Sequence, residues 1–159
     1  MAPVNLGSRG SYFEDFAVGQ QIVTAGRTVT ESDIVNFAGL SGDFNQLHLN
    51  AEFSKQTIYG QRVAYGLLVL SIASGLANQT GFVEGTAIAF REINDWKFSK
   101  PVFIGDTIHV EMAVKETAAI PSINGGAVTI AVMVKNQRDE TVMKGLWKVL
   151  VISRPKVSL

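Results

Sequence analysis

The chain has 159 residues, of which 47% are apolar and 18% are charged, and its formal net charge is +0. This composition predicts one globular domain with a substantial core and excludes a disordered chain, and the balanced charge gives no sign of a nucleic-acid-binding surface. Because cysteine is absent, disulfides, a thiolate nucleophile and a sulfur-ligated metal are excluded, which suits the cytoplasmic location that we expect.

The first part of the chain alternates short elements with turns. We expect a flexible lead-in over residues 1–11 and a single domain over residues 12–159. Residues 1–10 lack the apolar run of a signal peptide. Residues 12–19 have the pattern of an edge segment that ends in a turn, and residues 22–29 have that of a first strand.

A capping box marks the start of the first helix. In Thr30-Glu-Ser-Asp33, the Thr30 hydroxyl can accept from the Asp33 backbone N–H while the Asp33 carboxylate reaches back. The helix is predicted to end at Gly39 and Gly42. Four of its side chains are expected to face the core: Ile34, Val35, Phe37 and Ala38.

The main helix is predicted over residues 65–78. Residues 41–49 are expected to form a loop before it, and Asn50 can cap a second short helix through about residue 57. The main helix has almost no polar face, and a helix that is apolar all round is normally surrounded by other structure. Its apolar stretch is too short, and too interrupted by serines, to span a bilayer.

After this helix the hydrophobic period changes from helical to alternating, which indicates antiparallel strands with one covered face. Strands are predicted at four places, with a break near Asn94 and a polar turn before the last: residues 86–99, 107–115, 128–135 and 142–152. An apolar helix and a sheet with one apolar face complement each other. The sequence therefore predicts an α+β domain in which the sheet wraps around the helix, the hot-dog fold.

Asp43 and His48 are the candidate acid/base pair. They lie five residues apart in a segment that Gly42 allows to bend and that the Asn45 side chain can tie to itself. A carboxylate and an imidazole can hold one water between them, and an imidazole transfers protons in either direction near neutral pH. Spacing alone also fits a loop aspartate followed by a capping histidine. His109, on the polar side of a strand, is expected to be a surface residue.

Gly66 lies at the predicted start of the main helix, where the first backbone N–H groups have no intrahelical acceptor. Such an N–H can stabilise a developing oxyanion, although a glycine that only permits close helix packing fits the pattern equally. Ser74 lies about 80° round the helix from Gly66 and is expected near the same face. There it can contact a substrate or bond to its own helix.

At these residues the sequence resembles the MaoC-like hydratase family, which includes the (R)-specific enoyl-CoA hydratases. The resemblance covers roughly residues 12–151. It rests on the capping box and on three further stretches: Phe37-Ala-Gly-Leu-Ser-Gly-Asp-Phe-Asn-Gln-Leu-His48, Val63-Ala-Tyr-Gly-Leu-Leu68, and Trp96-Lys-Phe-Ser-Lys-Pro-Val102 followed by Gly105-Asp-Thr107.

The resemblance implies a hot-dog fold, usually dimeric, that hydrates trans-2-enoyl-CoA to (R)-3-hydroxyacyl-CoA or runs the reverse dehydration. The family's water-activating aspartate and histidine map onto Asp43 and His48. Its oxyanion glycine maps onto Gly66, and a serine further along the helix maps onto Ser74. This chemistry needs no cofactor and no metal.

Two positions depart from the family's usual pattern. Gln46 stands where proline is usual, and Tyr65 stands where histidine is usual. The changes delete no proposed catalytic group, but they bear on substrate preference and on the rigidity of the loop. Asn45, Tyr65 and Arg62 are expected to contact the substrate.

Two other functions fit the same residues: a hot-dog acyl-CoA thioesterase and a non-catalytic acyl-CoA-binding module. The expected partner is an acyl-CoA thioester, whose phosphates can pair with Arg62, Lys97 or Lys100, unless these are simply solvated surface residues. An open sheet edge predicts a homodimer or higher homo-oligomer, with the site formed between subunits. No nucleic-acid or membrane partner is expected.

Overall fold

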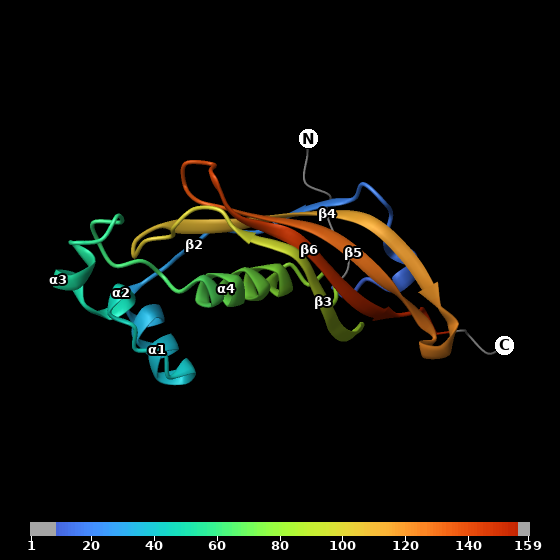
Figure 1. Ribbon diagram of the computed structural model, residues 1–159. Helices are drawn as coiled ribbons and strands as arrows, with labels where there is room; N and C mark the ends of the chain where they lie inside the picture. The colour runs from blue at the N-terminus through green and yellow to red at the C-terminus, as the bar shows by residue number, and fades with distance from the viewer. Residues whose placement is uncertain (1–8, 156–159) are drawn as a thin grey trace.

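The computed structural model describes residues 9–155 (Figure 1). Short strands and helices come first, the longest helix follows, and four long strands complete the chain. The elements are η1 (Phe13–Asp15), β1 (Gln21–Val23), β2 (Arg27–Thr28), α1 (Glu31–Ser41), α2 (Gln46–Leu49), α3 (Ala51–Ser54), α4 (Gly66–Gln79), β3 (Ala87–Phe98), β4 (Thr107–Ile120), η2 (Pro121–Ile123), β5 (Gly125–Lys135) and β6 (Thr141–Ile152).

An antiparallel sheet of six strands arches over α4 (Figure 1). The strand order is β1-β4-β5-β6-β3, and β2 also pairs with β4. Alternate side chains of β4 from Ile108 to Val114 are buried, as are those of β5 from Val128 to Val134. The alternation that predicted these strands thus presents one apolar face to α4, which confirms the expected α+β arrangement. β3 ends the order and pairs with β6 alone.

Helix α4 is covered on one side only. The side chains packed into the core are Leu68, Val69, Ile72, Ala73, Leu76 and Ala77. Leu67 and Ser71 are exposed on the side away from the sheet, so the expectation that the helix is surrounded holds for only part of its circumference. No helix within residues 9–155 is long and apolar enough to cross a membrane.

The break predicted near Asn94 is a bulge inside one continuous strand. Between Asn94 and Lys97 the register of β3 against β6 shifts, and Asp95 has a φ of 52°. The extra residue lets Trp96 stack on Trp147 in the core, with ring centroids 5.9 Å apart.

Residues 30–62, with α1, α2 and α3, project beyond the sheet and are called the arm below (Figure 1). The capping box is confirmed, because the Asp33 N–H donates to Thr30 Oγ1 at 3.2 Å and the Thr30 N–H donates to Asp33 Oδ2 at 2.8 Å. Gly42, with a φ of 73°, ends α1 in the left-handed conformation. Gly39 lies inside the helix and does not end it.

Three further expectations about the arm are wrong. Val35 is 52% exposed, because α1 has only a narrow contact with the body and buries Ile34 and Ala38 alone. Residues 46–49 form α2 where a loop was expected, since the Asn45 side chain caps a helical turn. The helix capped by Asn50 ends at Ser54.

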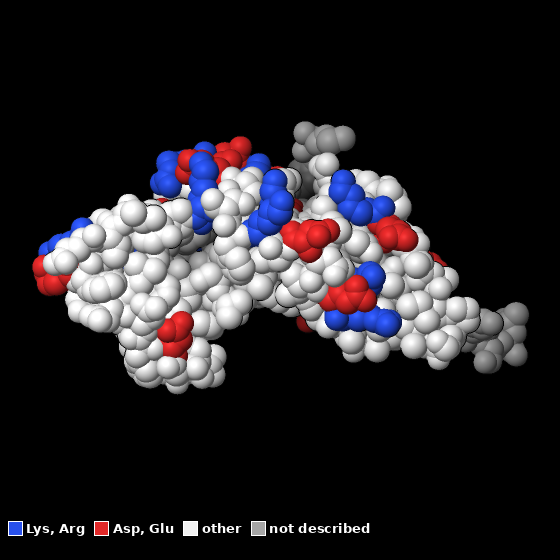
Figure 2. All heavy atoms as spheres, viewed as in Figure 1, with Lys and Arg blue, Asp and Glu red and all other residues white. Residues whose placement is uncertain are grey.

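The arm exposes large apolar side chains. Leu40 is 83% exposed, Phe44 65% and Ile58 94%. Figure 2 shows few charged side chains on this part of the visible face, whereas Lys, Arg, Asp and Glu gather over the β5–β6 turn and the outer face of the sheet. An apolar surface of this kind is typical of a protein interface.

The N-terminal segment differs from its prediction. Residues 12–19 form the short helix η1 and a turn, not an edge segment, and residues 22–29 are two strands interrupted at Thr24. There the Val110 N–H donates to Thr24 Oγ1 at 2.9 Å, so a side chain replaces the strand carbonyl. The predicted lead-in falls largely outside the described residues; of its last residues, the Ser11 N–H donates to the Phe82 carbonyl at 3.0 Å.

Candidate active site

Asp43 lies in the turn that follows α1. Its Oδ1 accepts the Asn45 N–H at 3.1 Å, and Asn45 Oδ1 accepts the Leu47 N–H at 2.9 Å. These two side-chain turns shape the loop, as expected for Asn45. Asp43 is exposed and uses one carboxylate oxygen in this bond, which leaves the other available to a water or ligand.

His48 has a defined orientation. Its Nδ1 lies 2.7 Å from the backbone carbonyl oxygen of Val63. Because a carbonyl oxygen can only accept, Nδ1 carries the proton of the neutral ring and Nε2 keeps its lone pair. Because Nδ1 is engaged, Nε2 is the nitrogen that can act as a base, on a residue that is half-buried.

Tyr65 contacts both Asp43 and His48. Its hydroxyl donates to the Asp43 carbonyl at 2.7 Å, and its ring packs on the His48 ring with centroids 3.8 Å apart and planes at 30°. Burial raises the pKa of Tyr65 above its ordinary value, and the Asp43 charge raises it further. The phenol therefore remains a neutral donor between the two candidate groups.

Gly66 is the first residue of α4, directly after Tyr65. It lines a cavity of about 350 Å³ whose other walls include Val69, Phe98 and Lys100. A Cβ at Gly66 would lie 2.9 Å from Phe98 Cε1, so only glycine leaves this helix start open. The candidate oxyanion donor and the candidate acid/base pair thus flank one aromatic residue.

The segment before α4 is fixed by the loop between β3 and β4. Val63 forms an isolated bridge with Phe103, and the Ala64 N–H donates to the Val102 carbonyl at 2.8 Å. The same Val63 offers its carbonyl to His48. The position of His48 therefore depends on where this loop is held.

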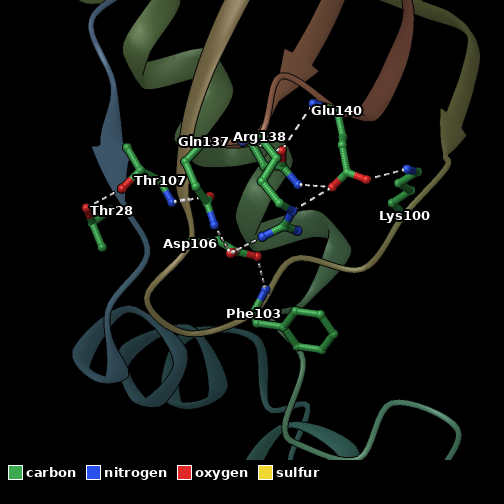
Figure 3. Close-up of polar contacts among 9 residues, drawn as sticks. Thr28, Lys100, Phe103, Asp106, Thr107, Gln137, Arg138 and Glu140 are labelled. Atoms are coloured by element: carbon green, nitrogen blue, oxygen red, sulfur yellow. Dashed lines mark hydrogen bonds and ion pairs between the residues drawn. The ribbon is translucent and has the colours of Figure 1, made fainter.

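A polar network holds that loop against the β5–β6 turn (Figure 3). Asp106 is buried; it accepts the Phe103 N–H at 2.9 Å and the Gln137 Nε2 at 2.6 Å. Glu140 accepts from Lys100 at 2.7 Å and from Arg138 at 2.9 Å. Hydrogen bonds from Asn136, Lys100 and Arg138 lower the pKa of Glu140 to about 2.

Ser74 is not brought to Gly66. It lines a separate cavity of about 160 Å³ between α4, β3 and β6, with Phe90 and Trp147 among its walls. The two residues were expected on one face, but eight residues of helix also separate them by about 12 Å along the axis. A neighbouring cavity of about 340 Å³ lines the intervening stretch and includes Leu70 and Ile93.

Other candidate contacts already have partners within the chain. Arg62 Nη1 donates to Glu31 Oε1 at 2.9 Å, and its Nη2 contacts the other carboxylate oxygen of Glu31. This pairing lowers the pKa of Glu31 and ties the end of the arm to α1. Lys100 is paired with Glu140, as described above, and Lys97 is exposed on β3.

His109 lies on the outer face of β4, away from this site, and is half-buried. Its ring, Glu111 and Asp139 offer atoms within 4.8 Å of one another. However, the Lys135 ammonium lies 3.0 Å from each of these carboxylates. The lysine already supplies the positive charge that a metal ion would bring.

The sequence marked Tyr65 as a departure from a family pattern and as a substrate contact, and its contact with both members of the pair was missed. The hydrophobic residue Val63 contributes through its backbone carbonyl, and no side-chain pattern signals such a contact. Asp43 and His48 are thus held in place by Tyr65 and Val63, neither of which is a candidate acid or base.

A sheet that wraps a helix, with an aspartate and a histidine beside the helix N-terminus, defines a hot-dog domain with a candidate acid/base site. Residues 15–141 match the family described as the MaoC like domain, and the chain belongs to this family. It is 39% identical over 104 residues to Protein MaoC of Klebsiella aerogenes, covering 65% of this chain and only 30% of that protein. It is 36% identical to an (R)-specific enoyl-CoA hydratase of Rhodospirillum rubrum, covering 69% of this chain and 72% of that one.

Solved structures agree with the fold. A structure described as a monoamine oxidase regulatory protein from Archaeoglobus superimposes with a TM-score of 0.85 at 43% identity, covering 92% of this chain and 97% of that one. A Mycobacterium tuberculosis protein described as a double hotdog fold gives a TM-score of 0.82 at 18% identity, covering 94% of this chain and 46% of that one. The predicted fold and the predicted MaoC-like family are confirmed.

Proposed function

We propose that this protein adds water across the double bond of a trans-2-enoyl-CoA to give a (R)-3-hydroxyacyl-CoA, or catalyses the reverse dehydration. The observation that supports this most strongly is the convergence of Asp43 and His48 on Tyr65, directly before the N-terminus of α4. Together they offer a base, a second acceptor for water and an oxyanion donor, which are the three groups that hydration needs.

In the proposed reaction, a single water donates one hydrogen bond to His48 Nε2 and a second hydrogen bond to the Asp43 carboxylate. The oxygen of this water forms a bond to C3 of the enoyl group as one of its protons passes to the Asp43–His48 pair. The C2–C3 π electrons move toward the thioester, where the N–H of Gly66 stabilises the oxygen. A proton from the pair then bonds to C2, so that one water is added and the pair returns to its starting state.

The cavities suggest how the ligand lies. With the thioester at Gly66, the acyl chain follows the space between α4 and β3 past Leu70 toward Ser74. The walls along this path are mostly apolar, as an acyl chain requires. Lys100 is the cationic side chain among the residues that line the cavity at Gly66, and it can pair with the CoA phosphates.

A second copy of the chain is part of the proposal. β3 is an edge strand with large exposed apolar side chains, among them Ile88, Phe90 and Ile93. The candidate pair also lies on an exposed part of the arm, whereas proton transfer benefits from exclusion of bulk water. A homodimer that pairs the edge strands and covers the arm would enclose the site. Sedimentation equilibrium should then give twice the 17.2 kDa chain mass.

The test of function is to mix the purified protein with trans-2-enoyl-CoA substrates of increasing length and follow the loss of the conjugated thioester. We expect turnover by the wild type, and losses of about 100-fold or more in Asp43→Asn and His48→Gln, the usual size for an acid/base group. His109→Gln, which changes the other histidine, should retain full activity. Equal rates in all four proteins would exclude the proposed pair.

The products separate the alternatives. Chiral analysis should show the (R)-3-hydroxyacyl-CoA. Release of free CoA thiol without loss of conjugation would indicate a thioesterase, and tight binding without any product would indicate an acyl-CoA-binding module. A cytoplasmic location is also part of this proposal and is supported by the absence of cysteine.

A further inference from the structure

We propose that Tyr65 is a positioning residue that aligns the Asp43 loop with the His48 ring, through its hydroxyl and its ring separately. This inference rests on the proposed function of the same site. It assigns a role to a side chain that carries no acid/base duty of its own, at a position where the arm and the start of α4 meet.

The hydroxyl fixes the Asp43 loop. Tyr65 Oη donates to the backbone carbonyl of Asp43 at 2.7 Å, and the side chain of Tyr65 is buried, with 3% of its surface exposed. The loop itself is exposed, and the hydrogen bonds of the Asp43 N–H and of the Asp43 and Asn45 side chains stay within residues 41–47. The phenol is therefore a contact that ties Asp43 to the start of α4.

The ring fixes the His48 imidazole from one side. The two ring centroids lie 3.8 Å apart at 30°, so the imidazole covers the face of the phenol. The hydrogen bond from Nδ1 to Val63 fixes the other direction of the ring.

Tyr65 is itself held rigidly. Its backbone carbonyl accepts the Val69 N–H at 3.1 Å in the first turn of α4, and its ring packs on Phe37 of α1 with centroids 5.1 Å apart. Because Tyr65 is anchored to α4 and contacts both candidate groups, it fixes Asp43 and His48 relative to Gly66. Small misplacements of reacting groups cost much rate, so this alignment matters for turnover.

Two substitutions separate the contributions. Tyr65→Phe keeps the ring and removes the hydrogen bond, and Tyr65→Leu removes both. Tyr12→Phe is the matched control, because Tyr12 lies in the N-terminal segment against Arg154, 4.9 Å from its guanidinium. For each protein, kcat and KM are measured with the shortest enoyl-CoA that the wild type hydrates. The ring-proton NMR signals of the two histidines are recorded in parallel, with His109→Gln assigning them.

We expect kcat to fall about tenfold in Tyr65→Phe and about 100-fold in Tyr65→Leu, with KM changed less than threefold and Tyr12→Phe unchanged. The His48 ring protons lie over an aromatic face, so their signals should be displaced upfield in the wild type and in Tyr65→Phe. Tyr65→Leu should lose that displacement. A variant that is folded but less stable would keep it, so the loss reports the missing aromatic ring.

Wild-type kcat in Tyr65→Phe would overturn the role of the hydroxyl. His48 signals that are the same in Tyr65→Leu and the wild type would overturn the role of the ring, and this measurement needs no turnover. If Tyr65→Leu does not fold, Tyr65→Phe decides the role of the hydroxyl, and His48 signals without an upfield displacement in the wild type would overturn the role of the ring. A wild type without hydratase activity but with the displaced His48 signals would contradict the proposed function and leave the arrangement itself supported.

Discussion

The body of this protein, formed by the sheet and α4, and the arm of residues 30–62 are held in different ways. In the body, alternate side chains of each long strand enter one continuous core. In the arm, the buried apolar side chains are Ile34 and Ala38 of α1, and single polar contacts such as the capping box and the Arg62–Glu31 pair supply further links. The candidate acid and base belong to the arm, and the oxyanion glycine belongs to the body. The site therefore depends on the few contacts that join the two.

The largest effect on stability should come from the body. Ile130 is 2% exposed and packs between the sheet and α4, so Ile130→Ala should lower the free energy of unfolding by about 3 kcal/mol. Met133→Ala, on the opposite face of the same strand, should change it by less than about 0.5 kcal/mol. Urea denaturation of both variants tests this. Similar losses on the two faces would contradict a one-sided core.

The next effect should be on activity at the junction. Gly66→Ala places a methyl group within 2.9 Å of Phe98, at the open helix start, and should lower kcat/KM about 100-fold, the size of losing one oxyanion donor. Gly75→Ala is the matched control, because a Cβ there meets nothing within 4 Å. It should raise stability by up to about 1 kcal/mol and keep activity. Equal activity of the two variants would argue against Gly66.

A smaller effect should be confined to the arm. Thr30→Ala removes the acceptor for the Asp33 N–H and should cost about 1 kcal/mol. Hydrogen exchange should show faster exchange in α1 while the long strands keep their protection. Ser32→Ala, two residues further along and outside the capping contacts, serves as control. A uniform change over the whole chain would show that arm and body unfold as one unit.

The smallest effect at neutral pH should come from Glu140. Its folded-state pKa of about 2 lies below the ordinary value of 4.5, so its contribution to stability is present above pH 4.5 and is lost as the pH falls toward 2. Unfolding curves between pH 7 and about 2 should show this loss in the wild type and a weaker pH dependence in Glu140→Gln. Identical pH dependence in both proteins would contradict a charged Glu140 in the network.

The body could be predicted from sequence because its signal is periodic. In β4, every second residue is apolar, as at Ile108, Val110, Met112 and Val114. This alternation predicts which face of the strand is buried and so constrains the register of the sheet. The arm offers no such repetition. Val35 was placed inward by a helical pattern, but only a neighbouring element can decide which side of an isolated helix is covered.

The candidate site was partly predictable for the same reason. Asp43 and His48 could be singled out by residue type, and Gly66 by its place at a helix start. Their meeting point at Tyr65 depends on tertiary contacts across 22 residues, from Asp43 to Tyr65. The angle around the helix placed Ser74 near the face of Gly66, and the distance along the axis puts it at a second cavity.

The pairing of Trp96 with Trp147 has a consequence for observing this protein. These are the only two tryptophans of the chain, and their rings stack with planes 18° apart. Stacked indoles share their electronic excitation, so the pair should give a circular-dichroism couplet, and its fluorescence should respond when a ligand enters the cavity that Trp147 lines. The molecule thus carries its own optical probe at the inner end of the proposed acyl path, and binding can be followed without any label.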